Sequence, residues 1–327
     1  MTGLSDSFQR PINYLRISVT DRCNLRCIYC MPSDGICLLS HHDILTYEEI
    51  YTVAKAAAEL GINKVRISGG EPLVRSRLPR LIQMLAQIDA IDDISLTTNG
   101  ILLGRYAAEL KSAGLRRVNV SLDTLKPDKF EFITRGNNLG DVLEGIDVAR
   151  SVGLNPVKIN MVVMSGINDD EVLNFATKTI NEGWHVRFIE LMPFAAATTI
   201  ALQFVPVSDM RRRLEQLGEL ESCLPGVGNG PAKYFRFPQA TGTIGFITPV
   251  SEHFCFHCNR LRLTADGKLR PCLLAEEEID LKQPLRSGIS SVGLKQLIEE
   301  AVASKPLRHH LAEGYIPKDR PFSQVGG

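Results

Sequence analysis

The feature that most constrains the fold is a repeated alternation of short apolar runs with longer amphipathic runs. Six such pairs follow one another between residues 14 and 218, at intervals of about 30 residues. This alternation predicts a parallel sheet whose strands are joined by right-handed helical crossovers. The expected strands are 14–20, 64–70, 93–100, 117–123, 156–164 and 185–193, and the expected helices are 46–61, 78–88, 103–114, 141–153, 169–183 and 207–218.

Six strand–helix pairs are too few for a closed eight-stranded barrel, so the fold class predicted is α/β, an incomplete (β/α)6 TIM-type barrel. Active sites in such folds lie at the carboxyl ends of the strands. Polar segments such as "SGGEP", "TTNG", "SLD" and "ELMP" follow or close these strands. The Gly- and Pro-rich segment 218–231 predicts a linker. We therefore expect a barrel domain over residues 1–220 and a second, C-terminal domain over residues 221–327.

Composition excludes several classes of protein. Lys plus Arg equals Asp plus Glu, at 37 each, which argues against a protein that coats nucleic acid. No apolar run approaches the length of about 18 residues that a membrane helix needs, and the N-terminus lacks a secretory pattern. We expect a cytoplasmic protein with no nucleic-acid or membrane partner. Eight cysteines in such a chain indicate metal or redox chemistry rather than disulfides.

Three cysteines, Cys23, Cys27 and Cys30, lie within eight residues after the first expected strand. Thiolates at this spacing can hold three irons of a 4Fe–4S cube and leave one iron open to a small molecule. Two alternatives remain: a zinc ion with a distant fourth ligand, and three unrelated core cysteines.

A second triplet, Cys255, Cys258 and Cys272, lies in the C-terminal region and again lacks a fourth cysteine. It predicts a second cluster, with a zinc ribbon completed by His253 or His257 as the alternative. The remaining two cysteines, Cys37 and Cys223, have no partner spacing and are interpreted as ordinary thiols.

Cations gather at the expected strand ends. Arg260 and Arg262 lie two residues apart, which places both on one face of an extended segment. Further cations in the barrel are Arg16, Lys64, Arg66, Lys158 and Arg187. Cations crowded together need an anion, and a triphosphate suits them because Arg binds phosphate through paired hydrogen bonds.

The segment "CNLRCIYC", with Tyr29 before its last cysteine, and the turn "SGGEP" resemble the radical S-adenosylmethionine (SAM) enzymes. The second triplet, the stretch "CNRLRLTADGKLRPCL" and the Gly-Gly end narrow this resemblance to one family, the GTP 3′,8-cyclases of molybdenum cofactor biosynthesis. It covers nearly the whole chain. It implies a lyase with SAM and two 4Fe–4S clusters, which converts GTP to (8S)-3′,8-cyclo-7,8-dihydroguanosine 5′-triphosphate.

The resemblance also implies residue roles. Cys23, Cys27 and Cys30 would hold the SAM cluster, and Cys255, Cys258 and Cys272 the cluster that meets guanine. Residues around SAM would be Tyr29, Gly70, Ser121 and Met192. Residues in contact with GTP would be Arg16, Arg66, Thr97, Lys158, Arg260, Leu261 and Arg262, with Lys64 and Arg187 left open. No catalytic side chain is assigned. Gly326 and Gly327 would reach into the active site.

The expected partners are GTP, an electron donor and cyclic pyranopterin monophosphate synthase, which would receive the product. The oligomeric state stays open, with a homodimer as one possibility. Two other interpretations remain: a peptide-modifying radical SAM enzyme with an auxiliary cluster, and a non-catalytic iron–sulfur or zinc protein.

Overall fold

The computed structural model describes residues 3–193, 202–224, 226, 228–317 and 320–325, so Gly326 and Gly327 lie outside the described residues. The six expected strands and their six following helices are all present, in the expected order. The strands are β1 (Tyr14–Ser18), β2 (Lys64–Ser68), β3 (Asp93–Thr98), β4 (Arg117–Ser121), β5 (Val157–Val163), β6 (His185–Glu190), β7 (Glu221–Ser222), β8 (Lys233–Arg236), β9 (Thr243–Ile247), β10 (Arg260–Leu263), β11 (Lys268–Arg270) and β12 (Ile279–Asp280).

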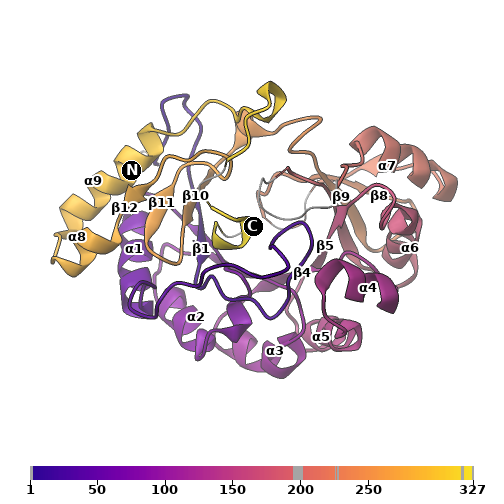
Figure 1. The fold of residues 1–327 in the computed structure, drawn as a ribbon, viewed down its shortest axis with the longest axis horizontal. Helices are drawn as coiled ribbons and strands as arrows, with labels where there is room; N and C mark the ends of the chain where they lie inside the picture. Colours follow the sequence, from indigo (N-terminus) through magenta and orange to yellow (C-terminus); the bar gives the residue numbers. More distant parts are fainter. Residues whose placement is uncertain (1–2, 194–201, 225, 227, 318–319, 326–327) are drawn as a thin grey trace.

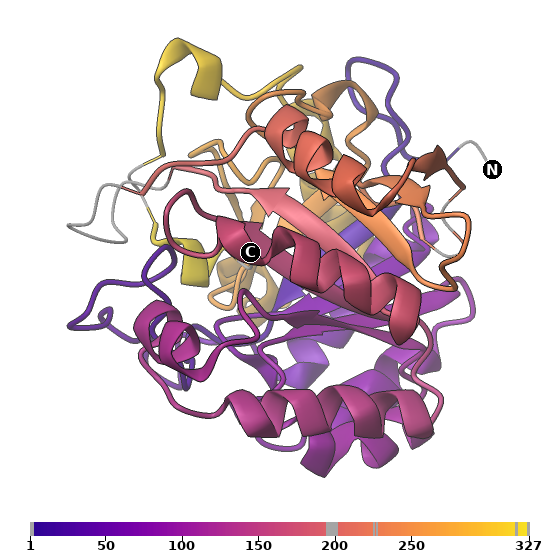
Figure 2. The same cartoon turned by 90° about the vertical axis from the view of Figure 1, so that its right-hand side faces the viewer.

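The helices cover the outside of the curved sheet (Figures 1 and 2). They are α1 (Tyr47–Glu59), α2 (Leu78–Ala86), α3 (Leu103–Ser112), α4 (Pro127–Thr134), α5 (Leu139–Ser151), α6 (Val172–Asn181), α7 (Val207–Leu214), α8 (Lys282–Arg286) and α9 (Ser291–Ala303). The first helix begins at the expected N-cap, because Thr46 and Glu49 form a capping box. No helix in the described parts of the chain is both long and apolar enough to cross a membrane.

Strands from the C-terminal region extend the central sheet at both ends. The order is β12-β11-β10-β1-β2-β3-β4-β5-β6-β9-β8-β7, in which β10 pairs in parallel with β1, and β9 in parallel with β6. The expected linker contains β7, which pairs with β8. Because both regions share one sheet, they enclose a common interior (Figure 1). The domain boundary at residue 220 stays a prediction.

Apolar and polar residues alternate along the central strands, as they must when the two faces of a sheet differ. In β2, Val65 and Ile67 are fully buried in the main hydrophobic core, whereas Arg66 between them reaches the cavity inside the curve. Closed barrels of this type fill that interior with branched aliphatic side chains. Here the inner face is polar, so the interior can hold a ligand.

The "SGGEP" turn after β2 packs directly on the loop that carries the first cysteine triplet. The Gly70 amide donates to the Thr20 carbonyl at 2.7 Å, and the Glu71 amide donates to the Arg22 carbonyl at 2.8 Å. A Cβ on Gly70 would lie 2.4 Å from the Arg22 carbonyl oxygen. The absence of a side chain at Gly70 therefore lets two backbone segments dock at the carboxyl ends of β1 and β2.

The buried Glu71 carboxylate continues this docking to the next strand end. It accepts hydrogen bonds from the Thr98 hydroxyl and the Asn99 amide, each at 2.7 Å, and from the Leu73 amide at 3.0 Å. The turn thus connects the cysteine loop with the ends of β2 and β3.

We expect Gly70→Ala to lower the free energy of unfolding of the protein without clusters by about 1–3 kcal/mol, because the added methyl group collides with fixed backbone. The measurement is urea unfolding. Gly140→Ala, where no atom lies within 4 Å of the new Cβ, is the matched control and should leave stability unchanged or raised. Equal stability of the Gly70 variant and the parent would contradict the docking role.

Candidate active site

One cavity lies inside the curve of the sheet, and residues beside both cysteine triplets line it. Tyr29 precedes Cys30, Phe254 precedes Cys255 and Leu273 follows Cys272. The described residues that line it are Arg16, Tyr29, Arg66, Thr97, Ser121, Asp123, Asn160, Val162, Arg187, Ile189, Met192, Pro231, Ile247, Pro249, Phe254, Arg260, Arg262, Leu273 and Phe322. A ligand in this cavity would therefore be close to both triplets at once.

The first triplet sits in the loop between β1 and α1. Burial raises the pKa of the Cys23 thiol to about 11, and burial together with the neighbouring Cys23 raises the pKa of Cys30 to about 12. Burial and the proximity of Cys30 also raise the pKa of Cys27 well above its usual range. The three thiols thus form one electrostatically coupled group. Holding all three as thiolates requires a positive partner.

Tyr29 joins this loop to the end of β4. Its hydroxyl donates to the Asp123 carboxylate at 2.8 Å, and the same carboxylate accepts from the Val162 amide of β5 at 2.8 Å. Burial raises the pKa of Asp123 to about 6. Asp123 was not assigned a role from the sequence, although the "SLD" segment that contains it was recognised as a strand end.

The second triplet has a different electrostatic setting. Cys255 begins the short 3-10 helix η4 (Cys255–His257), Cys258 follows it and Cys272 comes shortly after β11. Burial alone would raise the pKa of Cys258, but the positive charges of Arg260 and Lys305 lower it to about 7. Cys258 and Cys272 lie close enough to Cys255 to add to the burial that raises the pKa of its thiol.

The donor sets of both triplets fit iron–sulfur clusters. Each consists of three thiols that influence one another and that carry no disulfide in the structure. Within the described residues, no three Cys, His, Asp or Glu side chains converge on a single metal-ion position. Such convergence is not required by a cube, because each cysteine binds a different iron.

Three arginines lie side by side across the strands at one level of the sheet. Arg262 of β10 is in register with Arg16 of β1, which is in register with Arg66 of β2. All three line the cavity. Burial and the positive charge of Arg260 lower the pKa of Arg262 to about 10, and burial together with Arg262 lowers that of Arg16 well below its usual range. Three guanidinium groups at one level of a cavity wall have the charge and the hydrogen-bond donors that an anion requires.

A second cationic group lies on β5 and β6. Burial and the nearby Arg187 lower the pKa of Lys158 to about 6, and the Lys158 amino group donates to the Tyr234 hydroxyl at 3.1 Å. Burial lowers the pKa of Arg187 to about 10. A Cβ on Gly245, which pairs with Arg187, would lie 2.9 Å from the Arg187 side chain, so this glycine makes room for it.

Eight of the eleven residues predicted to bind SAM or GTP line the cavity, and Gly70, Lys158 and Leu261 do not. The six predicted cluster cysteines do not line it themselves, and Lys64, which was left open, does not either. Gly70 serves the docking described above, and Lys158 is buried beside the cavity. The Leu261 side chain belongs to the hydrophobic core, since it alternates with Arg260 and Arg262 on β10. Lys64 is the first residue of β2 and pairs with Tyr14, two residues before the arginine row along the strands. Arg187, left open from the sequence, lines the cavity.

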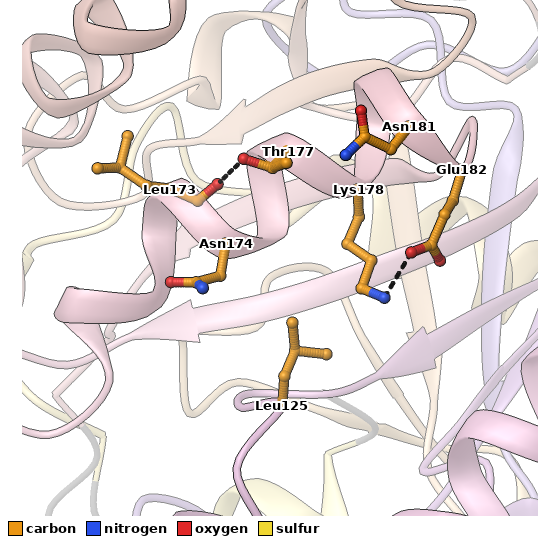
Figure 3. Close-up of a pocket in the computed structure, with 7 residues that line it drawn as sticks. All are labelled: Leu125, Leu173, Asn174, Thr177, Lys178, Asn181 and Glu182. Carbon is orange, nitrogen blue, oxygen red and sulfur yellow. Dashed lines mark hydrogen bonds and ion pairs between the residues drawn. The ribbon is translucent and has the colours of Figure 1, made fainter.

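A second hollow, on the outer surface of α6, lacks the features of this cavity (Figure 3). Its Lys178 ammonium group is paired with Glu182 at 2.6 Å, and the Thr177 hydroxyl donates to the Leu173 carbonyl of its own helix at 2.9 Å. None of the described residues that line it is adjacent in sequence to a triplet cysteine, whereas Tyr29, Phe254 and Leu273 of the main cavity are.

Comparison with known protein families agrees with this geometry. The family model described as Radical SAM superfamily matches residues 17–178, and the one described as Molybdenum Cofactor Synthesis C matches residues 184–311. A GTP 3′,8-cyclase of Pelotomaculum thermopropionicum is 54% identical over 326 residues, covering 99% of this chain and 100% of the relative. A GTP 3′,8-cyclase of Moorella thermoacetica is 51% identical over 324 residues, with 99% and 100% covered.

Solved structures share the fold at low sequence identity. Streptococcus suis SuiB bound to its precursor peptide SuiA has a TM-score of 0.65 at 14% identity, over 92% of this chain and 67% of that chain. SuiB bound to S-adenosylmethionine has a TM-score of 0.61 at 14% identity, over 87% and 68%.

The fold and the cysteine loop define a radical SAM enzyme, which implies a 4Fe–4S cluster and SAM as cofactors. Within that superfamily, the full-length relatives show that the chain belongs to the GTP 3′,8-cyclase family.

The lowered pKa of Lys158 predicts a pH dependence of stability. Between about pH 6 and the ordinary Lys value of 10.5, the unfolded chain binds a proton that the folded chain lacks, so stability rises with pH. One such proton contributes up to about 1.4 kcal/mol per pH unit. Lys158→Met should flatten this rise, measured by urea unfolding of the ligand-free protein between about pH 7 and 9.

Lys178→Met is the control, because Lys178 lies outside the cavity in its pair with Glu182. This variant should keep the slope of the parent. Parallel pH profiles for Lys158→Met and the parent would show that Lys158 is protonated throughout this range in the folded protein.

Proposed function

We propose that the cavity between the two triplets is where GTP is cyclised to (8S)-3′,8-cyclo-7,8-dihydroguanosine 5′-triphosphate, the first step of molybdenum cofactor biosynthesis. The observation that carries this proposal is the juxtaposition of both triplets and a row of buried arginines around one cavity. Membership of the GTP 3′,8-cyclase family supports GTP as the substrate.

The first triplet is the proposed ligand set of the SAM cluster. Tyr29, Ser121 and Met192 line the adjoining part of the cavity, where they would surround SAM. With SAM bound, this cluster would supply one electron for the cleavage of SAM, which is the radical chemistry needed to remove a hydrogen atom from carbon 3′ of the ribose. Gly70 and Glu71 fix the cysteine loop against β2 and β3, and the Tyr29–Asp123 hydrogen bond fixes it against β4.

The second triplet is the proposed ligand set of a second 4Fe–4S cluster, next to which guanine would bind. Phe254 and Leu273, each adjacent to a cysteine of this triplet, form the neighbouring cavity wall. In this assignment, the barrel region, 1–220, would hold SAM and its cluster, and the C-terminal region, 221–327, would hold the second cluster. Electrons would come from an external donor, and the product would pass to cyclic pyranopterin monophosphate synthase.

The arginine row, with Arg187 and Lys158, is the proposed triphosphate site. Arg16, Arg66 and Arg262 lie at one level of the sheet, so one extended polyphosphate could meet all three. Phosphate binding would also return a proton to Lys158, because a nearby anion raises the pKa of an ammonium group.

Apolar walls restrict water near the reacting atoms. Ile189, Met192 and Phe322 line the cavity beside Tyr29, and Phe322 comes from the C-terminal 3-10 helix η6 (Phe322–Gln324). A carbon radical attacks almost any group within reach, so tight positioning and exclusion of water protect it. Gly326 and Gly327 follow this segment and keep their proposed role in the active site.

The direct test is an anaerobic assay of cluster-reconstituted protein with SAM, a reductant and each nucleoside triphosphate in turn. We expect GTP to be the one nucleoside triphosphate that gives both 5′-deoxyadenosine and a cyclised purine. Equal product from ATP, or 5′-deoxyadenosine formation that no nucleotide stimulates, would contradict the assignment.

Two cysteine variants separate the proposed tasks. Cys30→Ala should abolish 5′-deoxyadenosine formation, because the SAM cluster loses a ligand. Cys272→Ala should retain uncoupled SAM cleavage but give no cyclised product, because only the second site is damaged. Both products are measured by chromatography beside the iron content. Parent-level cyclisation by Cys272→Ala would reduce the second triplet to a structural role.

Arg262→Ala should weaken GTP binding by roughly tenfold or more, since a hydrogen bond to a charged group is worth about 1.5–3 kcal/mol. SAM binding should change little, because Arg262 lies in the arginine row and not beside Tyr29. Calorimetric titration of the anaerobic protein with each ligand gives both affinities. A loss of the same size for SAM would point to general misfolding.

A further inference from the structure

A buried lysine, Lys305, lies behind the second cysteine triplet, just after the end of α9. It is 3% exposed, and its ammonium group donates to the Arg260 carbonyl at 2.9 Å and to the Pro271 carbonyl. Arg260 lies two residues after Cys258, and Pro271 directly precedes Cys272. The same ammonium group donates to the Cys258 sulfur. One side chain therefore joins two of the three cysteine-bearing segments.

The third cysteine is joined to the same place by Arg10. Its guanidinium donates to the Cys255 carbonyl at 2.7 Å, and also to the Pro306 carbonyl at 2.7 Å and the Leu307 carbonyl at 2.9 Å. Segment 305–307 is thus the point where the backbones around all three cysteines are connected.

The two cations differ in how their charge is compensated. Arg10 forms an ion pair with Asp6 at 2.6 Å, and both side chains are buried. Within the described residues, no carboxylate lies within ion-pair distance of Lys305, which has only carbonyls and a thiol as partners. A buried ammonium group is costly without a nearby anion. A cluster held by the three cysteines would carry negative charge on its sulfurs, so the loaded site supplies an anionic partner for Lys305.

We propose that Lys305 is a positioning residue of the second cluster that also favours its reduced form by supplying an uncompensated positive charge. This inference rests on the proposed second cluster. Reduction adds one negative charge, which a nearby ammonium group stabilises, and hydrogen bonds to the cysteine sulfurs raise the reduction potential of an iron–sulfur cluster in the same direction. Removal of the positive charge of Lys305 should therefore lower the reduction potential of the second cluster.

The test is a redox titration of reconstituted full-length protein, followed by electron paramagnetic resonance, with the variants Lys305→Met, Lys305→Gln and Lys305→Arg. The Cys272→Ala variant identifies the signal of the second cluster by the loss of that signal. Lys295→Met is the matched control on α9, because Lys295 forms a pair with Glu59 at 2.5 Å, away from the triplet.

We expect the Met and Gln variants to have an about tenfold lower ratio of reduced to oxidised second cluster at a fixed potential, which for one electron is about 59 mV. The Arg variant and the Lys295 control should match the parent, and the first cluster should be unchanged in all. Loss of second-cluster iron in the Met and Gln variants, with retention in the Arg variant, also supports the proposal.

A parent-like potential in the Met or Gln variant would overturn the proposal. So would an Arg variant as deficient in iron as the Met variant, because the lysine would then act by its shape and not by its charge. Failure of the proposed function is visible separately: the parent protein would then bind about four irons per chain and not about eight.

Discussion

Mutual repulsion among buried cations is the constraint on which the rest of the site depends. Arg16, Arg66 and Arg262 are adjacent across three strands, and nearby cations add to burial in lowering the pKa values of Arg262, Arg16 and Lys158. An interior of branched aliphatic residues would make the fold more stable without any ligand. The chain instead carries an electrostatic cost that a polyanion relieves, so the same interaction that weakens the empty fold provides affinity for a triphosphate.

The extended sheet brings the parts of this site together. Because β10 pairs with β1, the Arg260–Arg262 segment continues the inner surface that begins with Arg16 and Arg66. Because β9 pairs with β6, Gly245 lies beside Arg187 and leaves room for its side chain. The second cysteine triplet flanks β10 and β11, and its neighbours Phe254 and Leu273 line the cavity together with residues of the "SLD" and "ELMP" strand ends.

Local patterns in the sequence predicted the six strand–helix units, the Thr46 cap and the arginines that line the cavity, because strand alternation and capping depend on nearby residues. Tyr29, Thr97, Ser121 and Met192 came from the family resemblance, and other lining residues, such as Asn160, Pro231 and Phe254, were not predicted. Long-range pairing was not predictable in this way. The strands β8 and β9 lie outside the repeated strand–helix pattern, so it did not reveal their partners, and β7 was interpreted as part of a linker. Leu261 shows a further limit: resemblance implied a ligand contact, whereas strand alternation directs its side chain into the core.

The two cysteine triplets have the same number of ligands but opposite surroundings. Around the first triplet, burial raises the pKa values of all three thiols, and the negative charges of Glu71 and Asp123 add to this effect. Around the second, Arg260 and Lys305 add positive potential, and the pKa of Cys258 falls to about 7 despite burial. A negative setting disfavours an added electron and a positive setting favours it. If both triplets hold the proposed clusters, these surroundings would favour reduction of the second cluster over reduction of the first. This electrostatic difference gives a physical reason why one chain carries two triplets that look equivalent in the sequence.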